Sequence, residues 1–364
     1  MIIYIILIII SLILFGLRNS IAYNNAILRK LILASVIMLL LALTIFRGIT
    51  VGTDYMAYNS YYYSSSAELK IQYIENGYIL LNSLARSLNL FIIIPMLEFA
   101  ISFFGMFSLA KVSKCNDFSF VSMYILTYTY MQSFNALRQF IAMGFISFGC
   151  TFLFRDKKGK TLWFLLFILL ACQFHSSSLI MLIIPLLMKF HVTSTKVFIS
   201  GIVTTILFAT GLGIKITQPL IMMNEHYATK YSDSITFLSS SGNKGIIQFL
   251  PVIIQFILFY FYLFLNREDK DLFYLESQKY NLIFTGYLIF LILYSAGGNG
   301  VIDRIQMFFF VFCIIANCYF VDKTVIRSVN LKILYQLLVI GFWVLYCVLR
   351  LVLNNAGVVP YILG

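Results

Sequence analysis

Long, uninterrupted runs of apolar residues constrain the fold of this chain more than any other feature of its sequence. A helix needs about 20 apolar residues to cross the hydrocarbon core of a bilayer, and only helices and closed barrels satisfy their backbone groups there. The runs are continuous rather than alternating, which predicts helices instead of barrel strands. The sequence therefore predicts an all-α, polytopic transmembrane helix bundle.

The runs predict about twelve helices, and the whole chain, residues 1–364, is predicted to form a single integral membrane domain. The first run follows Met1 without a basic segment or a small-residue cleavage site, which predicts a retained helix rather than a signal peptide. The predicted ranges are 1–17, 31–46, 91–110, 118–134, 136–154, 161–174, 176–190, 197–217, 245–265, 281–296, 301–320 and 333–352.

Composition excludes two other classes of protein. Only 11% of the residues are charged, whereas soluble domains have roughly 25%, so a soluble globular enzyme is excluded. The net charge of +12 invites a nucleic-acid partner, but Lys and Arg occur in short groups between apolar runs and form no extended basic face. We expect no nucleic-acid partner.

The basic residues instead predict the orientation in the membrane. If the N-terminus is outside, 17 of the 26 Lys and Arg residues fall in inner segments. Because cytoplasmic loops carry the excess of Lys and Arg, this asymmetry predicts an N-out, C-out topology. The other nine are Arg47, Lys70, Arg86, Arg138, Lys215, Lys230, Lys244, Arg304 and Arg350.

Two predicted extracytoplasmic segments are too long to be simple turns. Residues 47–90 include an amphipathic helix around 76–88, and residues 218–244 lead into a Ser/Gly stretch at 239–245. Long ordered loops are often functional, although that Ser/Gly stretch could equally be a mobile tip without a function.

No metal or other cofactor is predicted. The six Cys residues show no CxxC or Cys/His spacing, which argues against a disulfide framework or a zinc site. Asp269-Lys-Asp271 has the DxD form of metal-dependent glycosyltransferases, but it lies in a mixed-charge loop on the predicted inner side. We interpret it as a solvated loop.

Polar residues at the predicted outer ends of helices are the candidate functional residues, because charges are costly inside the membrane. Asn135, Arg138 and Gln139 have helical i, i+3, i+4 spacing, which predicts one shared helix face. A snorkelling Arg with two capping amides is the structural alternative. His175 lies at the outer junction of two runs, where its near-neutral unperturbed pKa suits a proton carrier, although a lone His is more often structural.

Further candidates occur in the first long loop and near residue 300. Asp54 and Tyr58 are i, i+4 if their segment is helical, and Glu75 precedes Gly77, which permits close approach of a ligand. Each carboxylate alone could simply be solvated. Arg304 follows Asp303 after a Gly-rich turn, and an ion pair between them is the structural alternative.

Glu98 lies inside an apolar run, and we interpret it as structural, protonated or hydrogen-bonded within the bundle.

Several Arg residues beside a lipid-exposed cleft suit a lipid-linked diphosphate, because Arg binds phosphate in a bidentate manner and is weakly hydrated. Tyrosines such as Tyr58 could stack on sugar rings, although tyrosines are also enriched at membrane interfaces for other reasons.

In these motifs the chain resembles the EpsG family of bacterial exopolysaccharide proteins, which is related to Wzy-type O-antigen and capsule polymerases. The resemblance spans about residues 1–320 and leaves the identity of the sugars open. Its motifs are Arg47-x4-Gly52-x-Asp54-x3-Tyr58, Glu75-x-Gly77-Tyr78, Asn135-x2-Arg138-Gln139-x2-Ala142, His175-x-Ser177 and Arg304.

The resemblance implies a metal-independent polysaccharide polymerase at the outer face of the bacterial cytoplasmic membrane. It would join undecaprenyl-diphosphate-linked repeat units, surrounded by membrane lipids, with a flippase and a chain-length regulator as further partners. Arg47, Arg138 and Arg304 would hold the diphosphates. His175 or Glu75 would be the general base, and Asp54 would orient an Arg or a sugar. Asn135, Gln139 and Tyr58 would provide further substrate contacts.

Three other functions remain open at this point. An O-antigen ligase-like enzyme would use the same donor with a different acceptor, and a membrane acyltransferase would also need a His. A lipid-linked oligosaccharide flippase would place its charges along a central cavity at mid-membrane depth.

Overall fold

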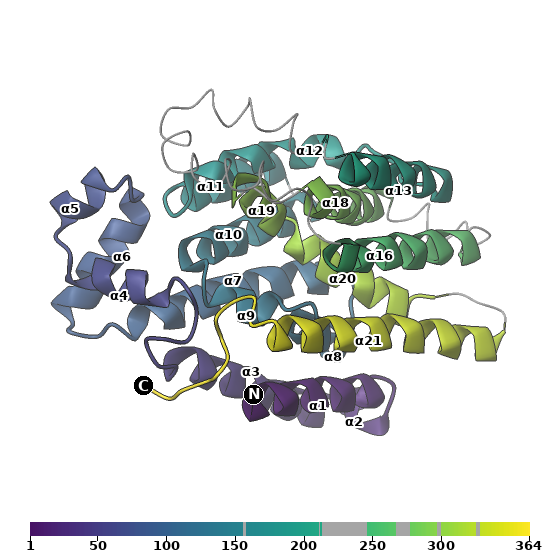
Figure 1. Cartoon of the computed structure of the whole chain (residues 1–364), viewed down its shortest axis with the longest axis horizontal. Helices are drawn as coiled ribbons and strands as arrows, with labels where there is room; N and C mark the ends of the chain where they lie inside the picture. Colours follow the sequence, from purple (N-terminus) through teal and green to yellow (C-terminus); the bar gives the residue numbers. More distant parts are fainter. Residues whose placement is uncertain (156–157, 211, 213–245, 267–276, 297–299, 325–327) are drawn as a thin grey trace. The chain divides into compact units, whose positions relative to one another are not determined.

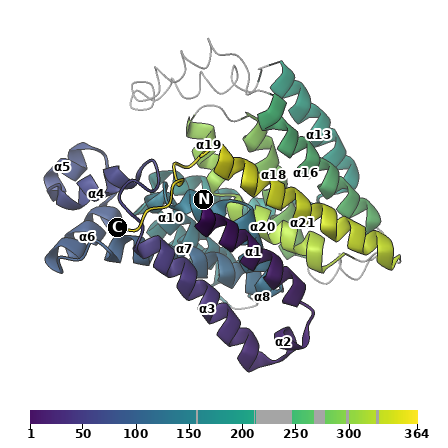
Figure 2. The same cartoon turned by 60° about the horizontal axis from the view of Figure 1, so that its bottom comes forward.

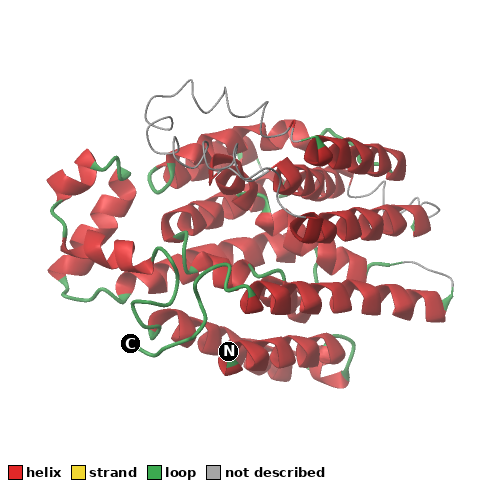
Figure 3. Cartoon of the chain, viewed as in Figure 1, coloured by secondary structure: helices red, strands yellow, loops and turns green. Residues whose placement is uncertain are grey.

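In the part of the chain that the computed structural model describes, helices are joined by loops and turns (Figure 3). That part comprises residues 1–155, 158–210, 212, 246–266, 277–296, 300–324 and 328–364. Within these ranges, β-type backbone pairing is limited to one isolated antiparallel bridge between Arg47 and Leu363. The prediction of an all-α fold is confirmed.

The chain divides into two compact units, Met1–Ile183 with Ile340–Gly364, and Ile184–Val339. The second unit comprises α12 (Ile184–Leu187), α13 (Ser194–Ala209), α16 (Ile246–Leu265), α18 (Ser277–Ala296), α19 (Gly300–Met307), α20 (Phe310–Asp322) and the first part of α21 (Val329–Val352). The loop predicted at 218–244 and the DxD motif at 269–271 lie outside the described residues. The single membrane domain stays a prediction.

The first unit carries most of the candidate residues. It comprises α1 (Ile2–Leu17), α2 (Ile21–Asn24), α3 (Ala26–Ile45), α4 (Tyr55–Tyr63), α5 (Ser66–Ile71), α6 (Asn76–Ser87), α7 (Ile93–Val112), α8 (Asp117–Leu126), α9 (Thr129–Ser133), α10 (Leu137–Leu153), α11 (Lys160–Cys172), the 3₁₀ helix η1 (Ser176–Ile183) and the last part of α21.

Three of the described helices are long and apolar enough to cross a membrane, namely α3, α7 and α21. Further apolar helices of 10 to 17 residues accompany them. The chain is a membrane protein. The count of twelve spans stays a prediction.

Three predicted helices differ from the observed ones at polar or irregular positions. The run predicted at 118–134 forms α8 and α9, because Tyr128 takes a left-handed backbone conformation with φ of 67°. At this break, the Thr127 hydroxyl donates a hydrogen bond to the Met123 carbonyl oxygen, and its Oγ1 lies within hydrogen-bond distance of Thr129 Oγ1. The run predicted at 301–320 forms α19 and α20, and the run at 176–190 begins as the 3₁₀ helix η1.

Helices α7 and α10 pack with their backbones in close approach. A methyl group on Gly105 would lie 2.3 Å from the Gly144 carbonyl oxygen, and one on Gly144 would lie 2.3 Å from the Ile101 carbonyl oxygen. Small residues allow this kind of helix packing in membranes. The contact fixes α10, whose first turn carries Arg138.

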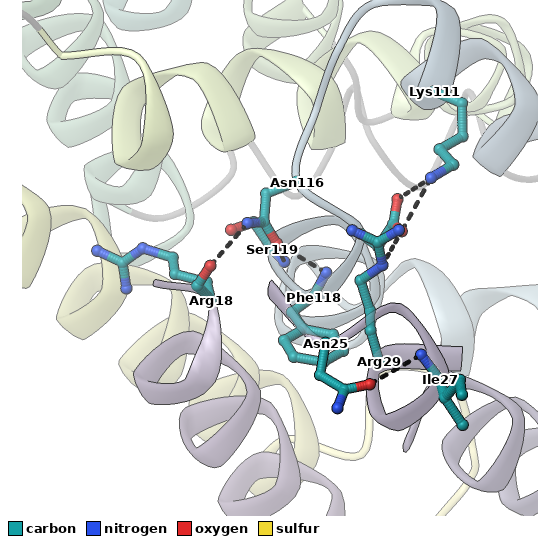
Figure 4. A network of polar contacts seen from close by, with 9 residues as sticks. Arg18, Asn25, Ile27, Arg29, Lys111, Asn116, Phe118 and Ser119 are labelled. Atoms are coloured by element: carbon teal, nitrogen blue, oxygen red, sulfur yellow. Dashed lines mark hydrogen bonds and ion pairs between the residues drawn. The ribbon is translucent and has the colours of Figure 1, made fainter. Parts of the chain in front are cut away.

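One end of the first unit holds a basic polar network (Figure 4). Arg29 at the start of α3 and Lys111 at the end of α7 both pair with the buried Asp117 carboxylate, at 3.8 and 2.6 Å. Asn116 donates to the Arg18 carbonyl oxygen at 3.1 Å and caps α8. Three residues from the predicted inner side thus share one end of the unit.

The segment α4 to α6 lies at the opposite ends of α3 and α7 (Figures 1 and 2). It connects the C-terminus of α3 to the N-terminus of α7, and α3 is 20 residues, or roughly 30 Å, long. The three short helices bury an aromatic cluster that includes Tyr55, Tyr58 and Tyr78 against Leu137 of α10. This packing positions the segment on the helix that carries Arg138.

Candidate active site

Glu75 lies at the centre of a polar cluster formed by three separate parts of the first unit. It is the N-cap residue of α6, and its carboxylate forms an ion pair with Arg138 in the first turn of α10. Its other oxygen, Oε1, accepts a hydrogen bond from the Ser176 backbone N–H at 3.0 Å. The same oxygen lies 3.5 Å from Nδ1 of His175. We call Glu75, Arg138, His175 and Ser176 the Glu75 cluster.

The cluster keeps Glu75 ionised. Burial by itself would raise its pKa, but the hydrogen bond to His175, the charge of Arg138 and the Ser176 N–H together lower the pKa to about 2. Because the folded-state pKa lies below the ordinary value of 4.5, the stabilisation from this carboxylate is complete above about pH 4.5. It is lost as the pH falls towards 2, so the ion pair persists through neutral and mildly acidic pH.

Gly77 fixes the start of α6 against the residues before His175. Its backbone N–H donates to the Gln173 carbonyl oxygen at 2.8 Å. A methyl group at this position would lie 2.6 Å from that same oxygen, which is closer than real contacts allow. Glycine is therefore required here for close backbone approach, which places Glu75 beside His175.

Arg138 lies among aromatic side chains and retains an unused donor. Its guanidinium lies 5.9 Å from the centre of the Tyr78 ring, and a side-chain hydrogen bond joins it to Tyr58. Burial raises the pKa of Tyr58 to about 12 despite the charge of Arg138, so Tyr58 is a neutral phenol. Within the described part of the chain, Nε of Arg138 is buried without a hydrogen-bond partner. Such a donor can bind a further anionic oxygen.

Arg47 is buried between two rings just after α3. Only 3% of the residue is exposed, and its guanidinium lies 3.9 Å from the centre of Tyr55 and 4.3 Å from the centre of Phe134. Burial lowers its pKa, while the charges of Tyr55 and Glu98 act in the opposite direction. Among the residues that the structure describes, none forms a hydrogen bond to its three guanidinium nitrogens.

The family model of EpsG proteins matches residues 30–363. The chain belongs to the EpsG family. The match covers nearly the whole chain and includes every residue of the Glu75 cluster. No curated protein and no solved structure matches it significantly.

Asn135, Arg138 and Gln139 do not share one helix face, in contrast to the prediction. Asn135 lies in the turn before α10, while Arg138 and Gln139 lie in its first turn. The prediction of one face for all three residues is wrong, because α9 ends at Ser133 and α10 begins only at Leu137. The Asn135 side-chain amide donates to the Ala356 carbonyl oxygen at 2.8 Å, and Gln139 is buried.

The contacts of the C-terminal segment 356–364 with the residues around Arg47 and Asn135 were not predicted from the sequence. The Gly52 N–H donates to the Gly357 carbonyl oxygen at 2.9 Å, and the Gly48 N–H donates to the Ile362 carbonyl oxygen at 2.7 Å. Together with the hydrogen bond from Asn135, these bonds hold residues 47–52 against the C-terminal segment. Gly357, with φ of 62°, is the local signal for a turn here.

The other residues singled out in the sequence lie at different places. Asp54 is exposed at the N-cap of α4, and its carbonyl oxygen accepts the Tyr58 N–H at 3.1 Å, as the predicted i, i+4 relation requires. Glu98 is buried in α7 and accepts a hydrogen bond from Ser102 at 3.1 Å, as its structural interpretation predicts. Arg304 lies in α19 of the second unit.

Groups of three or more His, Cys, Asp or Glu residues that could hold a metal ion do not occur in the described ranges.

Proposed function

We propose that this EpsG-family protein is a polysaccharide polymerase that joins undecaprenyl-diphosphate-linked repeat units by glycosyl transfer. The Glu75 cluster is the observation that carries the proposal. It combines a cation with a spare donor, a fixed carboxylate and an imidazole at one end of the first unit. These are the groups that a glycosyl transfer with a diphosphate leaving group needs.

In the reaction, an acceptor hydroxyl oxygen attacks the anomeric carbon of the donor. The bond from that carbon to the diphosphate oxygen breaks, and the lipid diphosphate leaves with the electron pair. Arg138 stabilises the developing charge through its free Nε donor. The leaving group needs no divalent metal in this scheme, because Arg138 stabilises its charge.

His175 is the general base, and Glu75 orients it. A carboxylate with a pKa of about 2 is a weak base at neutral pH, and Arg138 and the Ser176 N–H already bind it. Imidazole has an unperturbed pKa near 6.5 and takes the hydroxyl proton more readily. A carboxylate beside one ring nitrogen directs the other towards the substrate, as in other catalytic His sites.

Four other residues contribute to substrate binding in this scheme. Asp54 orients a sugar or an arginine from its exposed position, and Tyr58 holds Arg138. Asn135 and Gln139, both buried, support the first turn of α10 from within.

The two polar ends of the first unit support an N-out, C-out topology. Arg18, Arg29 and Lys111 gather at one end, which the positive-inside rule places in the cytoplasm. The Glu75 cluster then lies at the outer face of the bacterial cytoplasmic membrane. There the protein meets repeat units delivered by a flippase, and a chain-length regulator is a further partner.

Expression in a strain that lacks its own polymerase tests this function against its alternatives. A polymerase yields long glycans on the lipid carrier, whereas an O-antigen ligase-like enzyme moves unextended units to a different acceptor. An acyltransferase changes acyl content without changing length, and a flippase changes only the side on which single units accumulate. Unextended lipid-linked units at the outer face, with no longer species, would contradict the proposal.

Replacing Gly77 with Ala is expected to lower polymer yield. The new methyl group would meet the Gln173 carbonyl oxygen, so α6 must shift and move Glu75 away from His175. Gly16→Ala in α1 is the matched control, because no atom lies within 4 Å of its new methyl group. Polymer length on gels and thermal unfolding in detergent are measured for both. Normal polymer from Gly77→Ala would show that the cluster tolerates this displacement.

A further inference from the structure

One side of α6 is an apolar stripe that the described part of the first unit leaves exposed. Leu80, Leu84 and Leu88 are 71%, 49% and 52% exposed, and they recur every four residues along one face. The opposite side of the helix is buried in the aromatic cluster and includes Tyr78 and Ala85. The helix therefore has two apolar sides, and the first unit covers only one of them.

The α6 helix cannot cross the membrane. It has 12 residues, which is roughly 18 Å of helix. Its one charged residue, Arg86, is hydrogen-bonded within the segment α4 to α6. Arg86 donates to the Ser64 carbonyl oxygen and to Ser83 Oγ. No charged side chain therefore interrupts the leucine stripe.

The stripe continues into a membrane-length helix. Leu88 and the 50% exposed Leu90 lead directly into α7, which begins at Ile93 and is apolar enough to cross a bilayer. The segment before α6 follows α3, which is also of membrane length. Both ends of the segment are thus held at one membrane surface, and Figures 1 and 2 place α6 beyond the ends of these two helices.

We propose that α6 lies in the membrane interface, with Leu80, Leu84 and Leu88 inserted among the lipids. A helix of this kind buries its apolar side at the boundary between headgroups and acyl chains. Glu75 is the N-cap of the same helix, so the Glu75 cluster is then held at headgroup depth. This last consequence rests on the proposed function, because it is there that the diphosphate of a lipid-linked substrate lies.

Nitroxide labels at single introduced cysteines test the location of the stripe. The labels replace Leu80 and Leu84 in the full chain, reconstituted in phospholipid vesicles, and Ala67 on the exposed side of α5 is the control position. Unmodified protein gives the background from its own cysteines. We expect collisions with oxygen, which concentrates in lipid, to dominate at 80 and 84, and collisions with a water-soluble nickel chelate to dominate at 67.

Two outcomes would overturn the proposal. Dominant nickel collisions at 80 and 84 would place the stripe in water. Protection from both reagents would show that protein, such as a second copy of the chain, covers it. The measurement reads depth without catalysis, so it stands even if polymerase activity is disproved.

The double variant Leu80→Asp/Leu84→Asp tests the consequence for the site. We expect a loss of polymer with an unchanged melting temperature in detergent, because both side chains are exposed there, while Leu80→Met/Leu84→Met retains polymer. Normal polymer from the Asp variant would contradict a role of the stripe in positioning the cluster.

Discussion

Replacing Arg138 with Ala is expected to abolish chain extension, while single repeat units still reach the outer face on their lipid carrier. Arg138 is the cation of the Glu75 cluster and has a free Nε donor in the described structure. Loss of one such charge-stabilising donor typically costs about 100-fold to 1,000-fold in rate. Gel analysis of lipid-linked glycans, with detection at the cell surface, measures both parts of this prediction.

The folding of the Arg138 variant needs its own control. Removing the arginine leaves the largely buried Glu75 carboxylate without its ion pair, which is costly. The double variant Arg138→Ala/Glu75→Gln removes both charges, so we expect it to regain stability and to remain inactive. Lys70→Ala, at an exposed residue of α5, controls for the loss of one positive charge. Long polymer from the double variant would disprove the diphosphate-binding role.

Replacing His175 with Ala is expected to reduce the rate of extension strongly while donor binding is retained. The imidazole accepts the hydroxyl proton in the proposed reaction, and a positioned base typically contributes about 100-fold to 10,000-fold. Titration with the lipid-linked donor and single-turnover extension assays separate binding from chemistry. Unchanged kinetics would move the role of base to Glu75.

The variant Glu75→Gln distinguishes an orienting carboxylate from a base. The amide keeps the shape of the side chain but removes the negative charge 3.5 Å from Nδ1 of His175. The imidazole then loses the carboxylate that orients it, so we expect slower extension with part of the activity retained. Complete loss of activity at every pH would instead indicate that Glu75 is the base.

The residues of the candidate site could be predicted from the sequence, but the contacts between them could not. Apolar runs with polar residues at their ends indicated Glu75, Arg138 and His175 from the cost of charge in the membrane. The ion pair of Glu75 with Arg138 joins positions 63 residues apart, and no local pattern determines such a contact. The Ser176 N–H was also missed, since a backbone donor becomes free only because η1 begins at that residue.

Other differences have similar physical causes. Arg47 follows the end of α3, and its position predicted an outward-facing side chain that binds diphosphate. In the structure, Tyr55, Phe134 and the C-terminal segment cover it. Phe134 and the C-terminal segment come from distant parts of the chain, so no local pattern predicts that they cover Arg47. The breaks in the runs at 118–134 and 301–320 were missed because hydropathy does not report the backbone conformation of single residues such as Tyr128. The all-α fold was predictable because continuous apolar runs leave few alternatives.

Extension by the purified protein in the presence of a chelator tests the central claim most directly. The full chain is reconstituted in lipid and supplied with undecaprenyl-diphosphate-linked repeat units and excess chelator, beside the Arg138→Ala variant. The account predicts a ladder of lengthening glycans from the unmodified protein with or without chelator, and only single units from the variant. A ladder from the variant, or its loss from the unmodified protein on chelation, would contradict an arginine-based, metal-independent polymerase.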